Sequence, residues 1–195
     1  NTQILVNAIN NQLGTYGKTL DLSVTDNTKK GVDSEVVSLI KEMQSGSVDY
    51  LAISDVNPSY SLPTELGFDE ALTKVKTAVV FASRPNATTL NAKYIAAVPH
   101  YLESWNDSNP KTGHYSIMQP TITPLFDTMQ FQDCMLNWMG SDLSYYDYIK
   151  QTWEQTAFSL QSKNSMFEDF WNNCLHEGYF MPKVSNESAS LSFNG

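Results

Sequence analysis

The chain has 195 residues, a hydrophobic content of 41% and an aromatic content of 12%, which is typical of a globular chain rather than a disordered one. Its 21 acidic residues outnumber 12 basic ones and give a formal net charge of −9. This balance argues against binding to nucleic acid, which requires clustered Lys and Arg. No apolar run approaches the about 20 residues of a membrane span, so we expect no direct membrane span.

The first half of the chain alternates between helical and extended patterns. Apolar residues at helical spacing predict a helix over residues 4–13 that ends at Gly14, and residues 20–24 resemble a strand. A second amphipathic helix is predicted to begin with Asp33 as its N-cap and to stop at residues 45–46.

Three short apolar runs follow. Residues 49–54 and 77–82 predict buried strands, and residues 94–98 are a candidate third strand. Phe68 opens a helical pattern between the first two runs. A strand–helix–strand unit of this length closes as a parallel crossover. The alternation therefore predicts the α/β class: a Rossmann-like, three-layer α/β/α fold with a mostly parallel sheet, followed by C-terminal helices.

Residues 101–126 show no regular hydrophobic pattern. Residues that break regular structure recur in this segment: Pro110, Gly113, Pro120 and Pro124. These residues predict a segment without long regular structure, and such a segment is usually functional or an interface.

The last seventy residues are predicted to be mostly helical. Apolar stripes indicate helices near residues 131–139, 144–160 and 165–177, and the last two begin with sequences typical of capping boxes. We interpret the tryptophans of these helices as packing residues rather than as a platform for stacking bases. The predicted domains are a Rossmann-like domain at 1–126, a helical part at 127–183 and a loosely held tail at 184–195.

Ligands of parallel α/β sheets bind beyond the carboxyl ends of the strands, so the loops at residues 55–63, 83–90 and 99–116 are expected to meet there. Asp55, Asn57, Ser59 and Tyr60 follow the first core strand, where small polar side chains and backbone N–H groups would meet a phosphate. The alternative is a turn held by Asx hydrogen bonds. Thr88 and Thr89 follow the second strand, and they too could either contact a ligand or stabilise a turn.

His100, Glu103 and His114 lie close together in sequence, as an acid/base or metal cluster would, but a surface loop also collects polar groups and is the preferred interpretation. His176 falls in the last turn of a helix, where a cation favours the helix dipole. Cys134 and Cys174 lack the spacing of a metal or disulfide framework, so we expect two buried free thiols. No catalytic residue and no metal ligand is assigned.

A longer motif string resembles a known family. The sequence VNPSYSLP (56–63), followed by residues 79–107, resembles molybdopterin oxidoreductases of the dimethyl sulfoxide reductase type. GHYSIMQPTITPLFDTMQFQDCMLNWMG (113–140) and HYLESWND (100–107) more closely resemble the large periplasmic subunit of alternative complex III, a Tat-translocated molybdopterin-oxidoreductase-like protein with iron–sulfur clusters. Because the chain also lacks an initiator Met, we expect it to be a fragment of such a subunit.

The resemblance implies a Rossmann-like domain on the periplasmic side of the cytoplasmic membrane, within a larger exported subunit and in contact with other subunits of a membrane-bound respiratory complex. In catalytic members this fold helps to bind a molybdopterin guanine dinucleotide, and the iron–sulfur clusters lie in a separate region. By resemblance, Asn57, Pro58 and Ser59, with Thr88 and Thr89, map onto the cofactor-side loops. We expect no cofactor in this fragment, which lacks cluster-binding cysteines.

Three functions remain open from the sequence. The leading hypothesis is a non-catalytic scaffolding domain of a quinol-oxidising electron-transfer complex, acting through the loop at 101–126 and the aromatic helices. The alternative is a domain of a catalytic molybdopterin-dependent oxidoreductase. A stand-alone nucleotide-binding module is the third reading. We do not expect this fragment alone to be catalytic, although its parent would belong to an oxidoreductase.

Overall fold

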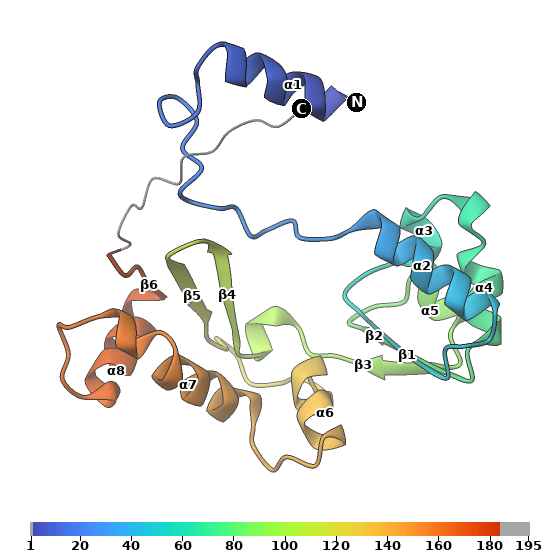
Figure 1. Cartoon of the computed structure of the whole chain (residues 1–195). Coiled ribbons are helices and arrows are strands. Elements are labelled where there is room, and N and C mark those ends of the chain that lie inside the picture. Colours follow the sequence, from blue (N-terminus) through green and yellow to red (C-terminus); the bar gives the residue numbers. More distant parts are fainter. Residues whose placement is uncertain (1, 184–195) are drawn as a thin grey trace. The chain divides into compact units, whose positions relative to one another are not determined.

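A computed structural model describes residues 2–183 (Figure 1). They group into two compact units that alternate along the chain. Residues 31–106 and 118–152 form one, which we call the sheet unit, and residues 2–30, 107–117 and 153–183 belong to the other, the hairpin unit. The division into domains at 1–126 and 127–183, inferred from the sequence, remains a prediction. The tail predicted at 184–195 lies outside the described residues.

The sheet unit is built on three parallel strands in the order β1-β2-β3. The strands are β1 (Tyr50–Ser54), β2 (Thr77–Ala82) and β3 (Tyr94–Ala97). In the central register Ile53 faces Val80, which in turn faces Ile95. The predicted strands and their parallel pairing are therefore confirmed.

One face of this sheet carries the main apolar core. Successive side chains of a strand point to opposite faces, so alternate residues of β1 and β2 share this face. Against it pack α2 (Asp33–Gln44) and α4 (Phe68–Lys74), which lie beside each other. The buried residues of this cluster are Ile40, Met43, Ile53, Phe68, Ala71, Leu72, Val75, Ala78 and Val80.

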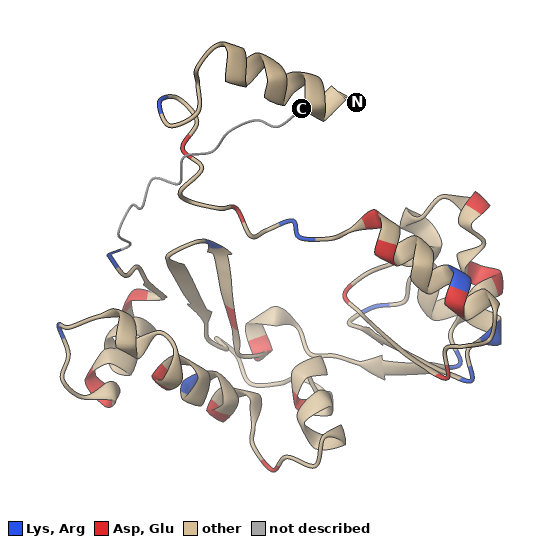
Figure 2. Cartoon of the chain, viewed as in Figure 1, with Lys and Arg blue, Asp and Glu red and all other residues tan. Residues whose placement is uncertain are grey.

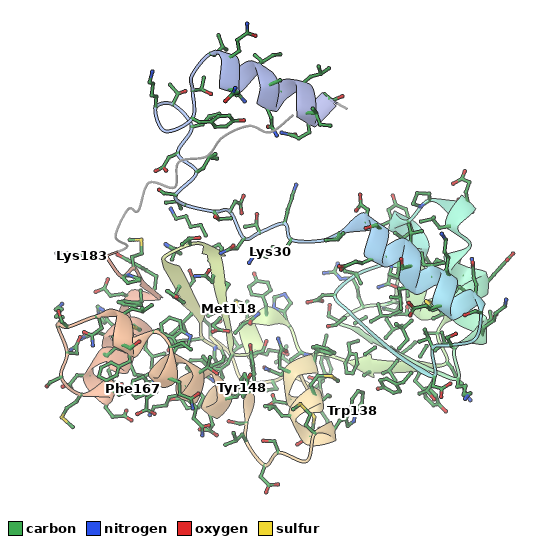
Figure 3. The ribbon with its side chains drawn as sticks, in the orientation of Figure 1. Lys30, Met118, Trp138, Tyr148, Phe167 and Lys183 are labelled. Carbon is green, nitrogen blue, oxygen red and sulfur yellow. The ribbon has the colours of Figure 1, made fainter. Side chains whose placement is uncertain are left out.

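The opposite face is covered by α6 (Phe131–Trp138). Phe81 points to this face and meets the rings of Phe131 at 4.9 Å and Trp138 at 5.8 Å between centroids. Tyr50 meets Trp138 edge-on at 5.6 Å, and Figure 3 labels Trp138 at the end of its helix. Helices thus lie on both faces of the parallel sheet, and the α/β class predicted from the sequence is confirmed.

Short helices follow the strands of the sheet unit. They are α3 (Pro58–Ser61) and η1 (Thr64–Leu66) after β1, α5 (Ala87–Asn91) after β2, and η2 (Tyr101–Glu103) after β3. These turns bring polar residues back over the carboxyl ends of the strands, where the candidate site lies.

The hairpin unit combines an antiparallel sheet with helices. The strands β4 (Asn106–Lys111), β5 (His114–Met118) and β6 (Tyr179–Phe180) pair in that order. Residues 101–126 contain no element longer than six residues, as predicted, but the segment is not without secondary structure, because it forms this hairpin. Pro110 lies within the edge strand β4, where a missing N–H is tolerated, and its carbonyl accepts a 2.9 Å hydrogen bond from Asn27 N.

Three further helices complete the described chain. They are α1 (Thr2–Gln12), α7 (Tyr145–Gln155) and α8 (Phe167–Glu177), with a 3-10 turn η3 at Phe158–Leu160. Ser144 caps the start of α7, as predicted, because its Oγ accepts from Asp147 N and donates to Asp147 Oδ2. The capping box predicted for α8 does not form, since the N-cap is Met166 and makes no side-chain cap.

Aromatic side chains form the core of the hairpin unit. Trp153 and Trp171 are almost fully buried and meet at 5.8 Å, and Trp153 also approaches Phe170 and Tyr115. The indole Nε1 of Trp153 donates a 2.9 Å hydrogen bond to Asp107 Oδ2. The packing role predicted for these tryptophans is confirmed.

The start of the chain departs from the prediction. The helix predicted over residues 4–13 is present as α1, but none of its residues is buried. Residues 20–24 form no strand, and a single bridge joins Tyr16 to Leu20. Apolar alternation was the basis for that predicted strand, and without a neighbouring strand to pair with it the pattern does not produce one.

Candidate functional site

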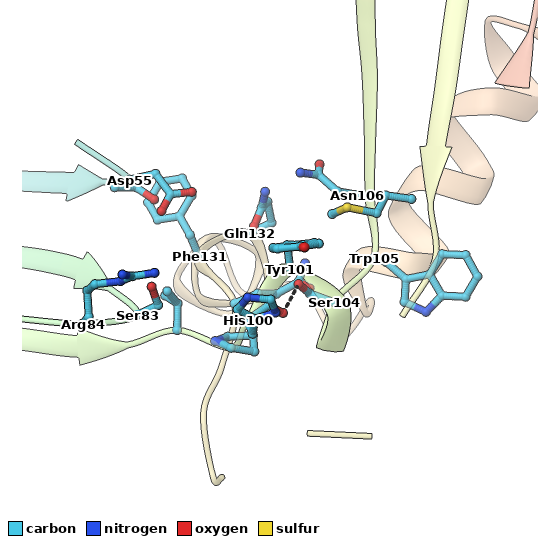
Figure 4. A pocket seen from close by; sticks show the side chains of 15 residues that line it. Asp55, Ser83, Arg84, His100, Tyr101, Ser104, Trp105, Asn106, Phe131 and Gln132 are labelled. Carbon is cyan, nitrogen blue, oxygen red and sulfur yellow. Dashed lines mark hydrogen bonds between the residues drawn. The ribbon is translucent and has the colours of Figure 1, made fainter. Parts of the chain in front are cut away.

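A cavity of about 290 Å³ lies at the carboxyl ends of the parallel strands, within the sheet unit (Figure 4). Its wall includes Ser54 and Asp55 from the end of β1, Ser83 and Arg84 from the end of β2, and His100 from the segment after β3. The expected meeting of the three post-strand loops is therefore observed, because parallel strands end at the same edge of a sheet.

The other wall comes from residues further along the chain. Trp105, Phe131 and Gln130 line it, the last two at the start of α6. No side chain caps the first turn of α6. The amide nitrogen Nε2 of Gln130 is buried and has no hydrogen-bond partner within residues 2–183. This wall thus combines aromatic surface with hydrogen-bond donors.

One acidic and one basic side chain lie at the ends of the strands. Asp55 and Arg84 lie there, as Figure 4 shows, and Trp105 lies on the far side of the cavity. Asp55 is the one non-glycine residue among those described whose φ is positive, at 56°. Asp adopts this left-handed conformation more readily than most residues do, and such conformations concentrate at binding sites. The cavity is therefore suited to a polar, charged ligand with a flat apolar part.

Three of the residues predicted to map onto cofactor-side loops, Asn57, Ser59 and Thr88, hold two loops together. Asn57 Oδ1 accepts hydrogen bonds from Thr88 N at 3.1 Å and Thr88 Oγ1 at 2.8 Å. Thr88 Oγ1 also accepts from Ser59 N at 3.1 Å, and Thr88 is fully buried. The loop after β1 is thereby joined to the helix after β2.

The two remaining predicted residues also have roles within the loops. Thr89 forms a reciprocal capping box with Asn86, the N-cap of α5. Pro58 occupies the first turn of α3 and, as a proline, has no N–H to donate. Neither these two nor Asn57, Ser59 and Thr88 line the cavity. Only Ser59 Oγ among the polar side-chain atoms of this group is buried without a partner in the described chain.

The His100, Glu103 and His114 cluster is not assembled as a metal site. His100 Nδ1 accepts from Leu102 N, and the two oxygens of Glu103 accept from His100 N and Leu125 N. His114 belongs to the hairpin unit and stacks on Tyr179. Across residues 2–183, no three His, Cys, Asp or Glu side chains are placed to hold a metal ion. His100 and Glu103 thus have the structural role that was the preferred reading.

Both cysteines are free thiols, as predicted, but only Cys174 is fully buried. Burial raises the pKa of Cys174 to about 11. The pKa of Cys134 is raised as well, first by burial and then by the charge of Asp133. A raised pKa keeps each thiol protonated near neutral pH, so neither is an activated nucleophile.

Two contributors to the cavity were not found by sequence reasoning. Arg84 stands two residues beyond β2, and its place at a strand end was the available signal. Gln130 enters from a segment 46 positions further on, and nothing local in the sequence places it beside Arg84.

The fold and the cavity define the class of protein: an α/β domain with a parallel sheet and a polar cleft at its carboxyl edge. Such domains host many unrelated activities, so the class alone does not give the function. None of the helices formed by residues 2–183 combines the length and apolar character needed to cross a bilayer.

Comparison with known proteins narrows this class. No protein-family model matches the chain. It is 30% identical, over 110 residues, to the molybdopterin-binding-like subunit of a menaquinone reductase from Nitratidesulfovibrio vulgaris (strain Hildenborough). The match covers 51% of this chain but 16% of that protein, so the chain spans about a sixth of the relative's length. This similarity supports a relationship to molybdopterin-oxidoreductase-like, electron-transfer proteins that act as subunits.

Proposed function

We propose that the chain is a non-catalytic scaffolding domain within the large subunit of a quinol-oxidising respiratory complex of the alternative complex III type. In this proposal it lies on the periplasmic side of the cytoplasmic membrane, as part of a larger exported subunit, and contacts electron-transfer subunits. Iron–sulfur clusters would be held by other parts of that subunit.

The observation that carries the proposal is the closed junction between Asn57 and Thr88. The acceptor oxygen of Asn57 receives both donors of Thr88, and Thr89 caps its own helix. In this arrangement the side chains of Asn57 and Thr88 bond to each other, which supports a structural rather than a cofactor-binding role for them. The resemblance to molybdopterin oxidoreductases then concerns the architecture rather than the chemistry.

Metal and pterin analysis of the intact protein tests the proposal. We expect less than stoichiometric molybdenum and no extractable pterin in the protein purified with its associated subunits. A molybdoenzyme prepared in parallel is the control for cofactor loss during purification. Molybdenum at one atom per chain would overturn the proposal.

A catalytic molybdopterin-dependent domain is the second candidate, and the polar cavity favours it. Arg84 and His100 face the same cavity, and Gln130 adds a buried donor without a partner in the described chain. Replacing Arg84 with Ala in the intact protein separates the candidates. The catalytic candidate predicts lower cofactor content and lower quinol oxidation, whereas the scaffold predicts neither. Lys41→Ala, at an exposed position of α2, is the control for loss of a surface cation.

A further inference from the structure

A second groove of about 370 Å³ lies in the sheet unit, on the side formed by α6 and the segments that flank it. Its apolar lining includes Pro124, Met129 and Leu143. Asn137 of α6 also lines it and donates a hydrogen bond to the sulfur of Met129 at 3.4 Å, which fixes the loop against the helix.

Apolar surface continues beyond the groove itself. Leu125 and Phe126 follow Pro124 directly, and their exposed fractions are 70% and 76%. The loop that carries them is held in place, because Leu125 N donates to Glu103 Oε1 and Ile122 N donates to the carbonyl of Leu102. Two adjacent large apolar side chains displayed on an anchored loop are typical of an interaction surface.

The same surface is uniformly acidic. Glu103, Asp133 and Asp142 line the groove, and Asp127 follows Phe126. Among the described residues, none that lines the groove is Lys or Arg, and the sequence has neither in residues 112–149. Figure 2 accordingly shows acidic but no basic positions along α6 and the loop that follows it. A surface of one sign attracts a partner of the other sign and rejects like-charged ones.

Thr128, which lines this groove and not the first cavity, carries an unsatisfied polar atom. Its Oγ1 is buried and has no hydrogen-bond partner within the described residues. Buried polar atoms in native proteins are nearly always paired. The unpaired Thr128 hydroxyl therefore adds to the apolar and acidic lining as an observation that favours a bound partner here.

We propose that this groove, together with Leu125 and Phe126, docks a segment of another subunit that carries apolar side chains flanked by Lys or Arg. The proposal rests on the proposed scaffolding function and specifies its partner. A small amine would fill the groove but leave Leu125 and Phe126 exposed. A second copy of this chain would bring a second net charge of −9 to an acidic face, so a basic partner fits better.

Photo-cross-linking in native membranes tests the docking surface. A benzoylphenylalanine is introduced at Phe126 in the intact protein, and at Leu90, which is 81% exposed, as the control. We expect cross-links from position 126 to a segment of another polypeptide rich in Lys or Arg, and fewer from position 90. Cross-links from position 126 to lipid, to a second copy or to an acidic segment, or none at all, would overturn the proposal.

Variants that change a charge or an apolar side chain at the groove test the same docking contact. Asp142→Lys and Leu125→Ser in the intact protein are expected to weaken retention of the cross-linked subunit about tenfold, and added salt to weaken it further in the wild type. Asp69→Lys and Leu90→Ser are matched exposed controls that should leave retention unchanged. Equal retention in all four variants would contradict the proposal.

A failure of the proposed docking surface can be distinguished from a failure of the proposed scaffolding function. If the subunit co-purifies with the chain but cross-links elsewhere, the scaffolding function stands and this docking surface is wrong. If no other subunit co-purifies with the wild-type protein under mild conditions, the scaffolding function itself fails.

Discussion

At the scale of single residues, Asn57 and Thr88 fasten the loop after β1 to the helix after β2. They are 31 positions apart in sequence, and their side chains form a buried hydrogen bond of 2.8 Å. Polar residues at a strand end have two possible uses, binding a ligand or closing a loop, and both require the same residue types. The residue composition of these loops therefore could not separate the two uses.

Replacing Asn57 with Ala is expected to lower the free energy of unfolding by about 2–3 kcal/mol. The substitution leaves the N–H and hydroxyl of the fully buried Thr88 without their acceptor, and an unsatisfied buried donor costs about 1–3 kcal/mol. Urea unfolding monitored by circular dichroism measures the change. Thr73→Ala removes an exposed hydroxyl bonded to Glu70 O and should shift stability by less than about 0.5 kcal/mol. Equal stability of the two variants would argue against a tight junction.

The raised pKa of Cys174 predicts that the free energy of unfolding falls at alkaline pH. Burial raises the pKa of its thiol from 9.0 to about 11, so the unfolded chain loses this proton at a lower pH than the folded chain. The free energy of unfolding should therefore decline as pH rises from 9 towards 11, and this contribution levels off above it. Urea midpoints across this range test the prediction in the wild type and in Cys174→Ala. The same slope in both proteins would show that the decline comes from other groups.

At the scale of elements, α6 closes the second face of the parallel sheet through aromatic contacts. Phe81 is 1% exposed and meets both Phe131 and Trp138. The apolar pattern of β2 and the stripe of α6 predict that each is partly buried. That they pack on each other follows only from the folded chain, because fifty residues separate them.

Phe81→Ala should remove about 3–5 kcal/mol of stability, the usual effect of truncating a buried aromatic side chain. The altered packing of Trp138 should also change the tryptophan fluorescence of the folded protein. Thermal and urea unfolding, with fluorescence as the readout, measure both effects. Tyr60→Ala truncates an aromatic ring that is 83% exposed and should behave like the wild type. A loss below about 1 kcal/mol for Phe81→Ala would mean that α6 is not held on the sheet as described.

The hairpin of β4 and β5 was not predicted from the sequence. Pro110 normally excludes a central strand, but β4 is an edge strand, and edge positions do not require every N–H. The position of a strand within its sheet is a property of the tertiary structure. A proline-rich sequence therefore could not reveal that these residues form a hairpin.

At the scale of the whole molecule, the acidic charge predicts which partners the chain does not bind. Its net charge is −9, and its twelve basic residues are scattered along the chain. Binding to a nucleic acid depends on neutralising phosphates with Lys and Arg. We expect no binding of the chain to duplex DNA or to single-stranded RNA at physiological salt.

Fluorescence anisotropy of labelled oligonucleotides, over a range of salt concentrations, measures whether the chain binds nucleic acid. A basic DNA-binding protein serves as the positive control. Saturable binding that weakens with salt would contradict the prediction, since it requires a basic surface that the charge distribution does not provide.

The sequence by itself determined the local elements and the class of the fold. Hydrophobic periodicity acts over a few neighbouring residues, so it located β1, β2, β3, α2 and the helices of the second half. It also placed the polar loops at the carboxyl edge of the sheet. The tertiary structure decided which of their side chains face inward. It turned Asn57 and Thr88 towards each other and brought Arg84 and Gln130 to one cavity. Those distances depend on how the whole chain closes, which no short stretch of sequence encodes.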